Sequence, residues 1–315
     1  MNKIYTIGEI LVEIMADKIG QSFTFPGLWN GPYPSGAPAI FIDQVTRLGV
    51  PCGIISCVGN DGFGTLNIAR LKSDGVDISG IRVLPGETTG SAFVSYHADG
   101  SRDFIFNIKN SASGKISADD VNESLLAECC HFHVMGSSLF SFAMVKAVKK
   151  AAAIVKQHGG TVSFDPNIRK EMLDIPEMRD ALHYVLELTD IFLPSDSEVM
   201  LLSMQTSPER AVAQYLQDGI KEVIIKRGKQ GASYYSASET FHIGSHQVEE
   251  VDPTGAGDCF GGAYIACRAL GYGVKQSLHY ANACGALAVT RMGPMEGTST
   301  LADITAFLDR EKVAS

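Results

Sequence analysis

The 315-residue chain lacks the features of a membrane or secreted protein. No stretch approaches the roughly 18 uninterrupted apolar residues that a membrane-spanning helix needs. The opening residues MNKIYTIGEILVEIM have no basic leader followed by an apolar core and a small-residue cleavage site, which together mark a secretory signal. We therefore expect a cytoplasmic protein with no membrane partner.

Positive charge and paired cysteines are also scarce. The 26 lysines and arginines are outnumbered by 35 aspartates and glutamates, and the resulting net charge of -9 excludes the basic surplus that binding a long polyanion requires. We expect no nucleic-acid partner. The seven cysteines are scattered without a CxxC pair, so we interpret them as reduced thiols of the core.

Several site motifs are missing. The chain has no GxxxxGK[ST], which argues against a P-loop NTPase, and no GxGxxG after its first apolar run, which argues against a Rossmann dehydrogenase. His242 and His246 have the spacing of two helical zinc ligands, but the glutamate of HExxH is absent. His131 and His133 are interpreted as core histidines.

The chain does contain apolar runs that alternate with segments of helical periodicity, a pattern typical of βαβ units around a parallel sheet. The pattern predicts an α/β fold with a Rossmann-like, doubly wound, mostly parallel sheet. The predicted strands are 3–10, 52–59, 129–136, 160–166, 190–195 and 222–228, and the predicted helices are 38–48, 63–74, 141–158, 177–188, 207–218, 257–270, 274–291 and 302–311.

One region departs from this alternation. Residues 89–108 alternate with period two on both sides of the turn cluster ADGS, which predicts a β-hairpin. Residues 11–17 and 21–27 also lack helical partners, so we expect them to join the hairpin in a small separate sheet. The prediction is one domain over residues 1–315, with a β lid formed by about 11–31 and 88–112.

Polar residues follow four of the apolar runs, where ligands bind in open α/β sheets. They include Asp165 and Asn167, then Ser195 and Glu198, and the glycines of KRGKQG at 226–231. Turn formation and helix capping explain any single cluster, but four together favour a site.

The fourth cluster is DPTGAGD, residues 252–258, which leads into a predicted helix. Gly255, Ala256 and Gly257 leave their backbone N–H groups open at a positive helix end, an arrangement that binds anions. Asp258 lies in the first turn, where it could accept a proton from an attacking hydroxyl group. Because phosphoryl transfer depends on fixed donors around the transferred oxygens, the pattern suits that chemistry, although Asp258 could also only complement the helix dipole.

The ordered motifs resemble those of the ribokinase-like (PfkB) carbohydrate kinases over nearly the full chain. They are GEILVE at 8–13, PSGAPAI at 34–40, VGNDGFG at 58–64, FDPNIR at 164–169, KRGKQG, DPTGAGD and ANACGALAV at 281–289. The resemblance implies a Rossmann-like domain with a β-sheet lid, and transfer of the ATP γ-phosphoryl group to a sugar hydroxymethyl.

Carried over by position, the resemblance also assigns residues. It implies Asp258 as catalytic base, with the anion hole at residues 255–257 and with Arg169 among the phosphate-positioning residues. The nucleotide is implied at Lys226, Gly228, Gly231 and Asn282, and Asn167 and Glu198 are implied to position phosphates and the hydrated Mg2+. A monovalent cation, K+, is implied near Asp252, Thr254, Ala288, Arg291 and Gly293, mostly through main-chain carbonyl groups.

The sugar pocket departs from the common family pattern. Ile40 replaces the usual Asn and Ser35 the first of two glycines, while Glu13 stands where fructokinases and ribokinases generally carry Asp. The substrate is expected to contact Glu13, Ser35, Gly36, Ala37 and Lys109; alternation along the hairpin allows only one of Arg102 and Lys109 to face inward.

The motifs are most similar to tagatose and related ketohexose kinases, which predicts a neutral ketohexose such as tagatose or fructose. GEILVE and DPNIRKEM are also similar to 2-keto-3-deoxygluconate kinases, and a non-catalytic sugar-binding regulator remains a further alternative. Because lid strands have open edges that often pair, we expect a homodimer through the lid.

Overall fold

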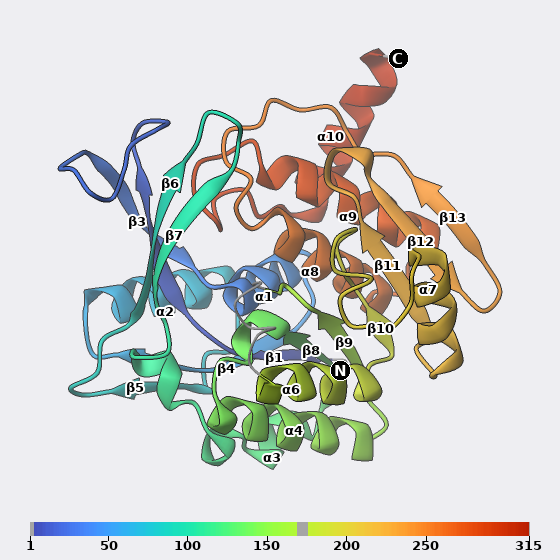
Figure 1. The fold of residues 1–315 in the computed structure, drawn as a ribbon, viewed down its shortest axis with the longest axis horizontal. Helices are drawn as coiled ribbons and strands as arrows, with labels where there is room; N and C mark the ends of the chain where they lie inside the picture. The colour runs from blue at the N-terminus through green and yellow to red at the C-terminus, as the bar shows by residue number, and fades with distance from the viewer. Residues whose placement is uncertain (1–2, 169–175, 315) are drawn as a thin grey trace.

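The computed structural model describes residues 3–168 and 176–314. In that part of the chain, a nine-stranded sheet runs through the centre of the body in the order β13-β12-β11-β10-β9-β8-β1-β4-β5 (Figure 1). Neighbouring strands from β11 to β5 are parallel, and β12 and β13 form an antiparallel edge. The strands are β1 (Lys3–Ile7), β4 (Cys52–Gly59), β5 (Ile81–Leu84), β8 (Cys129–Met135), β9 (Thr161–Asp165), β10 (Ile191–Phe192), β11 (Glu222–Lys226), β12 (Ala232–Ser236) and β13 (Thr240–Ile243).

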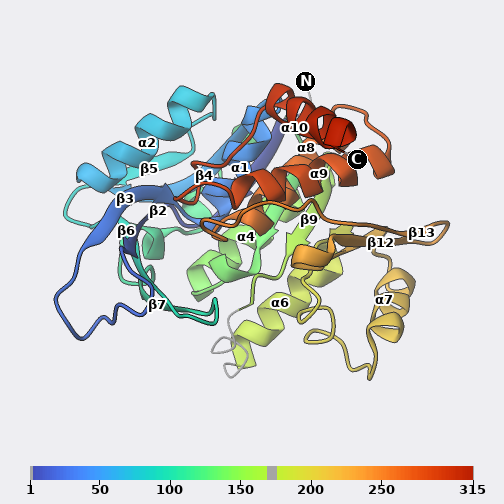
Figure 2. The same ribbon diagram turned by 90° about the horizontal axis from the view of Figure 1, so that it is seen from above.

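Helices cover both faces of this sheet (Figure 2). One layer contains α1 (Ala37–Arg47), α2 (Gly62–Asp74), α8 (Ala256–Ala269), α9 (Val274–Ala288) and α10 (Leu301–Ala314). The other contains α3 (Glu123–Leu126), α4 (Phe142–Gln157), α6 (Pro176–Leu188) and α7 (Pro208–Gln217). This is the doubly wound α/β architecture expected from the sequence, and it is confirmed.

Two apolar cores lie on opposite faces of the sheet because successive strand residues point to opposite sides. In β1, Ile4 packs into the core beneath α1, α8 and α9, whereas Tyr5 packs into the core beneath α4 and α6. Ile54 and Ile55 of β4 divide in the same way. Burial on both faces explains why these strands appear in the sequence as continuous apolar runs.

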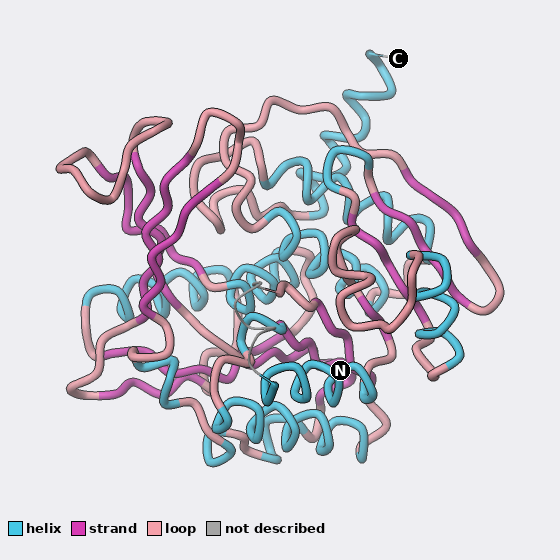
Figure 3. The backbone as a smooth tube through the Cα atoms, viewed as in Figure 1, coloured by secondary structure: helices cyan, strands magenta, loops and turns pink. Residues whose placement is uncertain are grey.

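A smaller four-stranded sheet stands beside the body in the order β3-β2-β6-β7 (Figure 3). Its strands are β2 (Leu11–Ala16), β3 (Trp29–Ser35), β6 (Gly90–Tyr96) and β7 (Arg102–Asn107). The β6–β7 hairpin pairs Tyr96 with Arg102 and confirms the predicted hairpin. The prediction of a strand at 21–27 is wrong, because that segment is a loop whose Phe23 stacks on Trp29. The strand that pairs with β2 in its place is Trp29–Ser35.

All eight predicted helices are present, with ends that shift by up to three residues. The helix expected to reach residue 291 ends at Ala288. Strands β5, β12 and β13 were not expected, because they lie at or next to the edges of the sheet and lack a fully buried apolar run. No described helix is long and apolar enough to cross a membrane.

Candidate active site

The carboxyl ends of several central strands place charged residues at one edge of the large sheet. β1 leads into Glu9, β9 ends at Asp165 and β11 ends at Lys226. Parallel strands bring their carboxyl ends to the same edge, where open α/β sheets bind ligands. Lys226 Nζ and Asp165 Oδ2 form an ion pair there, and Ser138 Oγ after β8 donates to Glu9 Oε2 at 2.5 Å.

Helix α8 begins at the same edge, directly after Gly255. Gly255 has φ +79°, a left-handed conformation that favours glycine, and a Cβ at this position would lie 2.7 Å from the carbonyl oxygen of Pro294. No side chain caps this helix end. The first-turn N–H groups, which have no partners within a helix, are therefore offered to a ligand, as the sequence motif predicted.

Two cavities meet at this turn. The larger, about 950 Å³, lies between the small sheet and the body, and Gly255 and Asp258 are in its wall. The smaller, about 430 Å³, is lined by Ala256 and Gly257 of the same turn and by Lys226. A group bound in one cavity can thus meet a group bound in the other across residues 255–258.

Asp258 is half-buried in a negative environment. Burial and the charge of Asp165 raise the pKa of the Asp258 carboxyl well above its ordinary value, Glu9 and Glu13 add to the rise, and Lys226 opposes it. A carboxylate whose charged form is disfavoured is a stronger proton acceptor than free aspartate. The geometry and the charges therefore suit Asp258 to general-base work.

Glu198 joins two loops at the strand ends. Its Oε1 accepts from the Ile168 main-chain N–H at 2.7 Å, and its Oε2 accepts from the N–H and hydroxyl of Ser195 at 2.8 and 2.7 Å. Ser195 therefore takes part in this arrangement where the family pattern has Asn. Asn167 has φ +39° and lines the larger cavity. Arg169 lies outside the described residues.

The larger cavity also contains most of the residues expected to bind sugar. Glu13, Gly36 and Ala37 line it together with Ile40, which replaces the family's usual Asn, and Ser35 donates a 2.6 Å hydrogen bond to Glu13 Oε1. The Ser35 hydroxyl thus orients a buried carboxylate toward which sugar hydroxyl groups could donate. The start of α1 lies beside β2 here, because β3 pairs with β2 and leads directly into α1.

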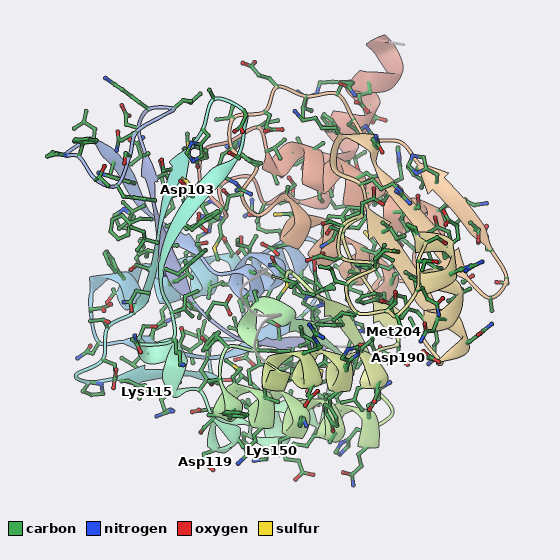
Figure 4. All side chains as sticks on the ribbon, in the orientation of Figure 1. Asp103, Lys115, Asp119, Lys150, Asp190 and Met204 are labelled. Atoms are coloured by element: carbon green, nitrogen blue, oxygen red, sulfur yellow. The ribbon has the colours of Figure 1, made fainter. Side chains whose placement is uncertain are left out.

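The small sheet covers this cavity with its hairpin. Arg102 lines the cavity and its Nη1 donates to Thr254 Oγ1 at 2.9 Å, while Tyr96 OH lies 3.3 Å from Asp252 Oδ1. Asp103 also lines it and lies on β7, far from Lys115, Asp119 and Lys150 at the foot of the body (Figure 4). Lys109, the other hairpin cation, is exposed and is not in the cavity wall.

Asp252 organises the loop before α8. Its Oδ1 accepts from the N–H and hydroxyl of Thr254 at 3.0 and 2.7 Å, and its Oδ2 accepts from the Gly293 N–H at 3.0 Å. Ala288 is buried at the end of α9, and Arg291 is exposed in the following turn. Three of the five residues expected near a monovalent cation are thus directly connected.

The smaller cavity holds the residues expected to bind nucleotide. Gly228, Gly231 and Asn282 line it with Lys226. Asn282 Nδ2 donates to the carbonyl oxygens of Ile243 and Gly244, both at 3.3 Å, and so fixes the loop at 244–250, which forms another part of the wall.

Sequence reasoning missed several residues of the two cavities. Glu9 follows β1 directly, so the same strand-end rule that selected Asp165 could have found it. Phe23, Phe104 and Phe106 enter the larger cavity from the small sheet and its loop, which no local motif marks.

The chain belongs to the pfkB family of carbohydrate kinases, whose family model matches residues 26–301. Fructokinase-1 of Zea mays is 31% identical over 98% of this chain and 98% of its own length. The predicted family and fold are therefore confirmed, and this chain is a sugar kinase of that family.

Solved structures agree with this assignment. An E. coli protein described as a "putative Ribokinase II", in complex with ATP and Mg2+, is 73% identical and superposes with a TM-score of 0.96 over 98% of this chain and 100% of that one. The fructokinase of Vibrio cholerae O395, with fructose, ADP and a calcium ion bound, is 26% identical with a TM-score of 0.84, over 98% and 99%.

Proposed function

We propose that the protein transfers the γ-phosphoryl group of ATP to a hydroxymethyl group of a neutral ketohexose such as fructose or tagatose. One observation carries the proposal: the two cavities share the first turn of α8, with Asp258 on the larger side and Gly257 on the smaller. Sugar in the larger cavity and ATP in the smaller would meet at the open N–H groups of that turn.

The chemistry follows from this placement. Asp258 accepts the proton of the sugar hydroxyl as its oxygen attacks the γ-phosphorus, and the amides of residues 255–257 stabilise the charge on the transferred oxygens. Positioning of the two substrates supplies much of the rate, because little covalent chemistry is asked of the protein.

The balance of charge in the larger cavity supports a neutral sugar. Among the lining residues that the structure describes, four are acidic (Glu9, Glu13, Asp103 and Asp258) and one, Arg102, is basic. Arg102 already donates to Thr254. A substrate carboxylate would be repelled by this set, which disfavours a 2-keto-3-deoxygluconate kinase.

Cofactor roles rest on the donor sets. Glu198 and Asn167 supply oxygen atoms of the kind that bind Mg2+ either directly or through its water ligands. The E. coli relative binds ATP and Mg2+, and a V. cholerae fructokinase variant was solved with fructose, ADP and a potassium ion. We propose ATP, Mg2+ and K+ for this chain, the last beside Asp252, Thr254 and Gly293. The homodimer through the lid and the cytoplasmic location stay predictions.

The test is ADP production from ATP and Mg2+ with a panel of fructose, tagatose, ribose and 2-keto-3-deoxygluconate, with and without K+. We expect sugar-dependent ADP with the highest kcat/KM on a ketohexose, and a kcat lower by about 10²–10⁴ in Asp258→Asn. A higher kcat/KM on 2-keto-3-deoxygluconate would contradict the neutral substrate. If sugar raises the melting temperature of the protein but no ADP is produced, the result would favour the alternative of a non-catalytic sugar-binding regulator.

A further inference from the structure

A buried ion pair lies beside the helix turn that the two cavities share. Lys226 ends β11 and Asp165 ends β9, and their side chains, 17% and 2% exposed, meet at the edge of the sheet. Removing two charges from water is unfavourable, and apolar residues of similar volume often stabilise a fold at least as well. Stability alone therefore does not explain why this ion pair is buried here.

The position of the ammonium group supplies that reason. A Cβ atom at Gly257 would lie 3.6 Å from Lys226 Nζ, so the ammonium adjoins the backbone of the anion-binding turn. Lys226 also lines the smaller cavity, while Asp258, one residue after Gly257, lines the larger. The cation is thus placed at the junction where a phosphoryl group would pass.

The surrounding charges keep this cation protonated. Burial alone would lower the pKa of Lys226, but the negative charges of Asp165, Glu198 and Asp258 outweigh burial and raise it. The ammonium group therefore presents a full positive charge at the junction. One of its three N–H groups donates to Asp165, which leaves two to donate to a bound group.

We propose that Lys226 is a catalytic residue that binds the phosphoryl group during its transfer, and that Asp165 is the residue that positions it. This rests on the proposed function. A bond forms between the sugar oxygen and the γ-phosphorus, the bond from that phosphorus to the β,γ-bridging oxygen breaks, and the hydroxyl proton passes to Asp258. Lys226 stays protonated throughout and offsets the negative charge of the transferred group and of the departing ADP.

Kinetics separate this role from simple nucleotide binding. A residue that holds ATP equally in the ground and transition states affects KM and leaves kcat unchanged, whereas one that acts in the transition state affects kcat. We expect Lys226→Met to lower kcat by about 10²–10³, the effect of removing one donor to a developing anion, with a much smaller change in the KM for ATP. Lys226→Arg, which keeps the charge, should recover part of kcat.

Asp165→Asn tests the positioning role. Lys226 keeps its charge in this variant but loses the carboxylate that holds it, so we expect a smaller fall in kcat than for Lys226→Met, again with little change in the KM for ATP. Wild-type kcat in Asp165→Asn would overturn the positioning role.

A double variant and a control variant distinguish a loss of catalysis from a loss of folding. Lys226→Met leaves Asp165 as a buried unpaired charge, whereas Lys226→Gln with Asp165→Asn replaces the pair by two neutral amides, and it too should show low kcat. Lys156 pairs with the buried Asp190 outside both cavities, so Lys156→Met should lower the melting temperature without lowering kcat.

Two results would overturn the catalytic role of Lys226: wild-type kcat in the double variant, or a raised KM for ATP with kcat unchanged in Lys226→Met. Either result in an enzyme whose wild type is active refutes this inference alone. A wild type that produces no sugar-dependent ADP refutes the proposed function instead.

Discussion

Gly255→Ala is expected to abolish most of the activity and to lower stability by more than the conformational cost alone. The left-handed conformation at φ +79° costs a non-glycine residue about 1–2 kcal/mol. The new Cβ would also lie 2.7 Å from the Pro294 carbonyl oxygen and 3.2 Å from Ile40 Cγ2, so the start of α8 must move. If that movement misaligns one donor of the anion-binding turn, kcat should fall by about 10²–10³.

The opposite end of the same helix provides a matched control. Gly271, after the last turn of α8, has φ +87°, but a Cβ there would meet nothing within 4 Å. Gly271→Ala should therefore have the same conformational cost and keep kcat. Urea unfolding measures the free energy of unfolding of each variant, and steady-state ADP production measures kcat. Unchanged kcat in Gly255→Ala, or an equal loss in both variants, would refute a role for this turn in binding an anion.

Three further predictions concern the larger cavity. Asp258→Asn should reduce kcat by about 10²–10⁴ and yet raise the melting temperature, because the folded protein disfavours the charge that it removes. Because the pKa of Asp258 is raised in the folded state, the folded protein binds more protons than the unfolded protein at pH values between about 3.9 and that raised pKa. The contribution of Asp258 to stability should therefore fall as pH rises, whereas kcat/KM should fall as pH is lowered and the base becomes protonated. A pH series of the melting temperature and of kcat/KM checks both signs. Glu13→Ala should raise the sugar KM and leave the KM for ATP unchanged, and an unchanged sugar KM would show that Glu13 does not contact sugar. Arg102→Ala removes the lid's 2.9 Å hydrogen bond to Thr254 and should also raise the sugar KM, with faster amide exchange across the hairpin; unchanged exchange would show that this contact does not hold the lid.

The electrostatics of the site explain why activity and stability should change in opposite directions. Asp258 faces the charges of Asp165, Glu9 and Glu13, and an array of buried carboxylates does not stabilise a fold. The same array disfavours the ionised form of the base and so strengthens it as a proton acceptor. Functional sites commonly hold such perturbed groups for this reason.

The local parts of this protein could be predicted from its sequence. Periodicity identified six of the parallel strands and every described α-helix longer than one turn, because burial on one stripe or on both faces leaves a regular pattern; it missed the edge strand β5 and the four-residue α3. DPTGAGD predicted an uncapped helix start with an acid in its first turn, and α8 has that start, since the conformation of Gly255 is a local property. The hairpin at 89–108 was predicted for the same reason.

Pairings between distant segments were decided only in three dimensions. No local pattern shows that Trp29–Ser35, rather than residues 21–27, completes the small sheet, because edge strands need no continuous apolar face. Nor does the sequence show that Arg102, and not Lys109, reaches the cavity, or that Lys226 meets Asp165 beside Gly257. Such contacts depend on strand order and register, which the packing of the whole chain determines.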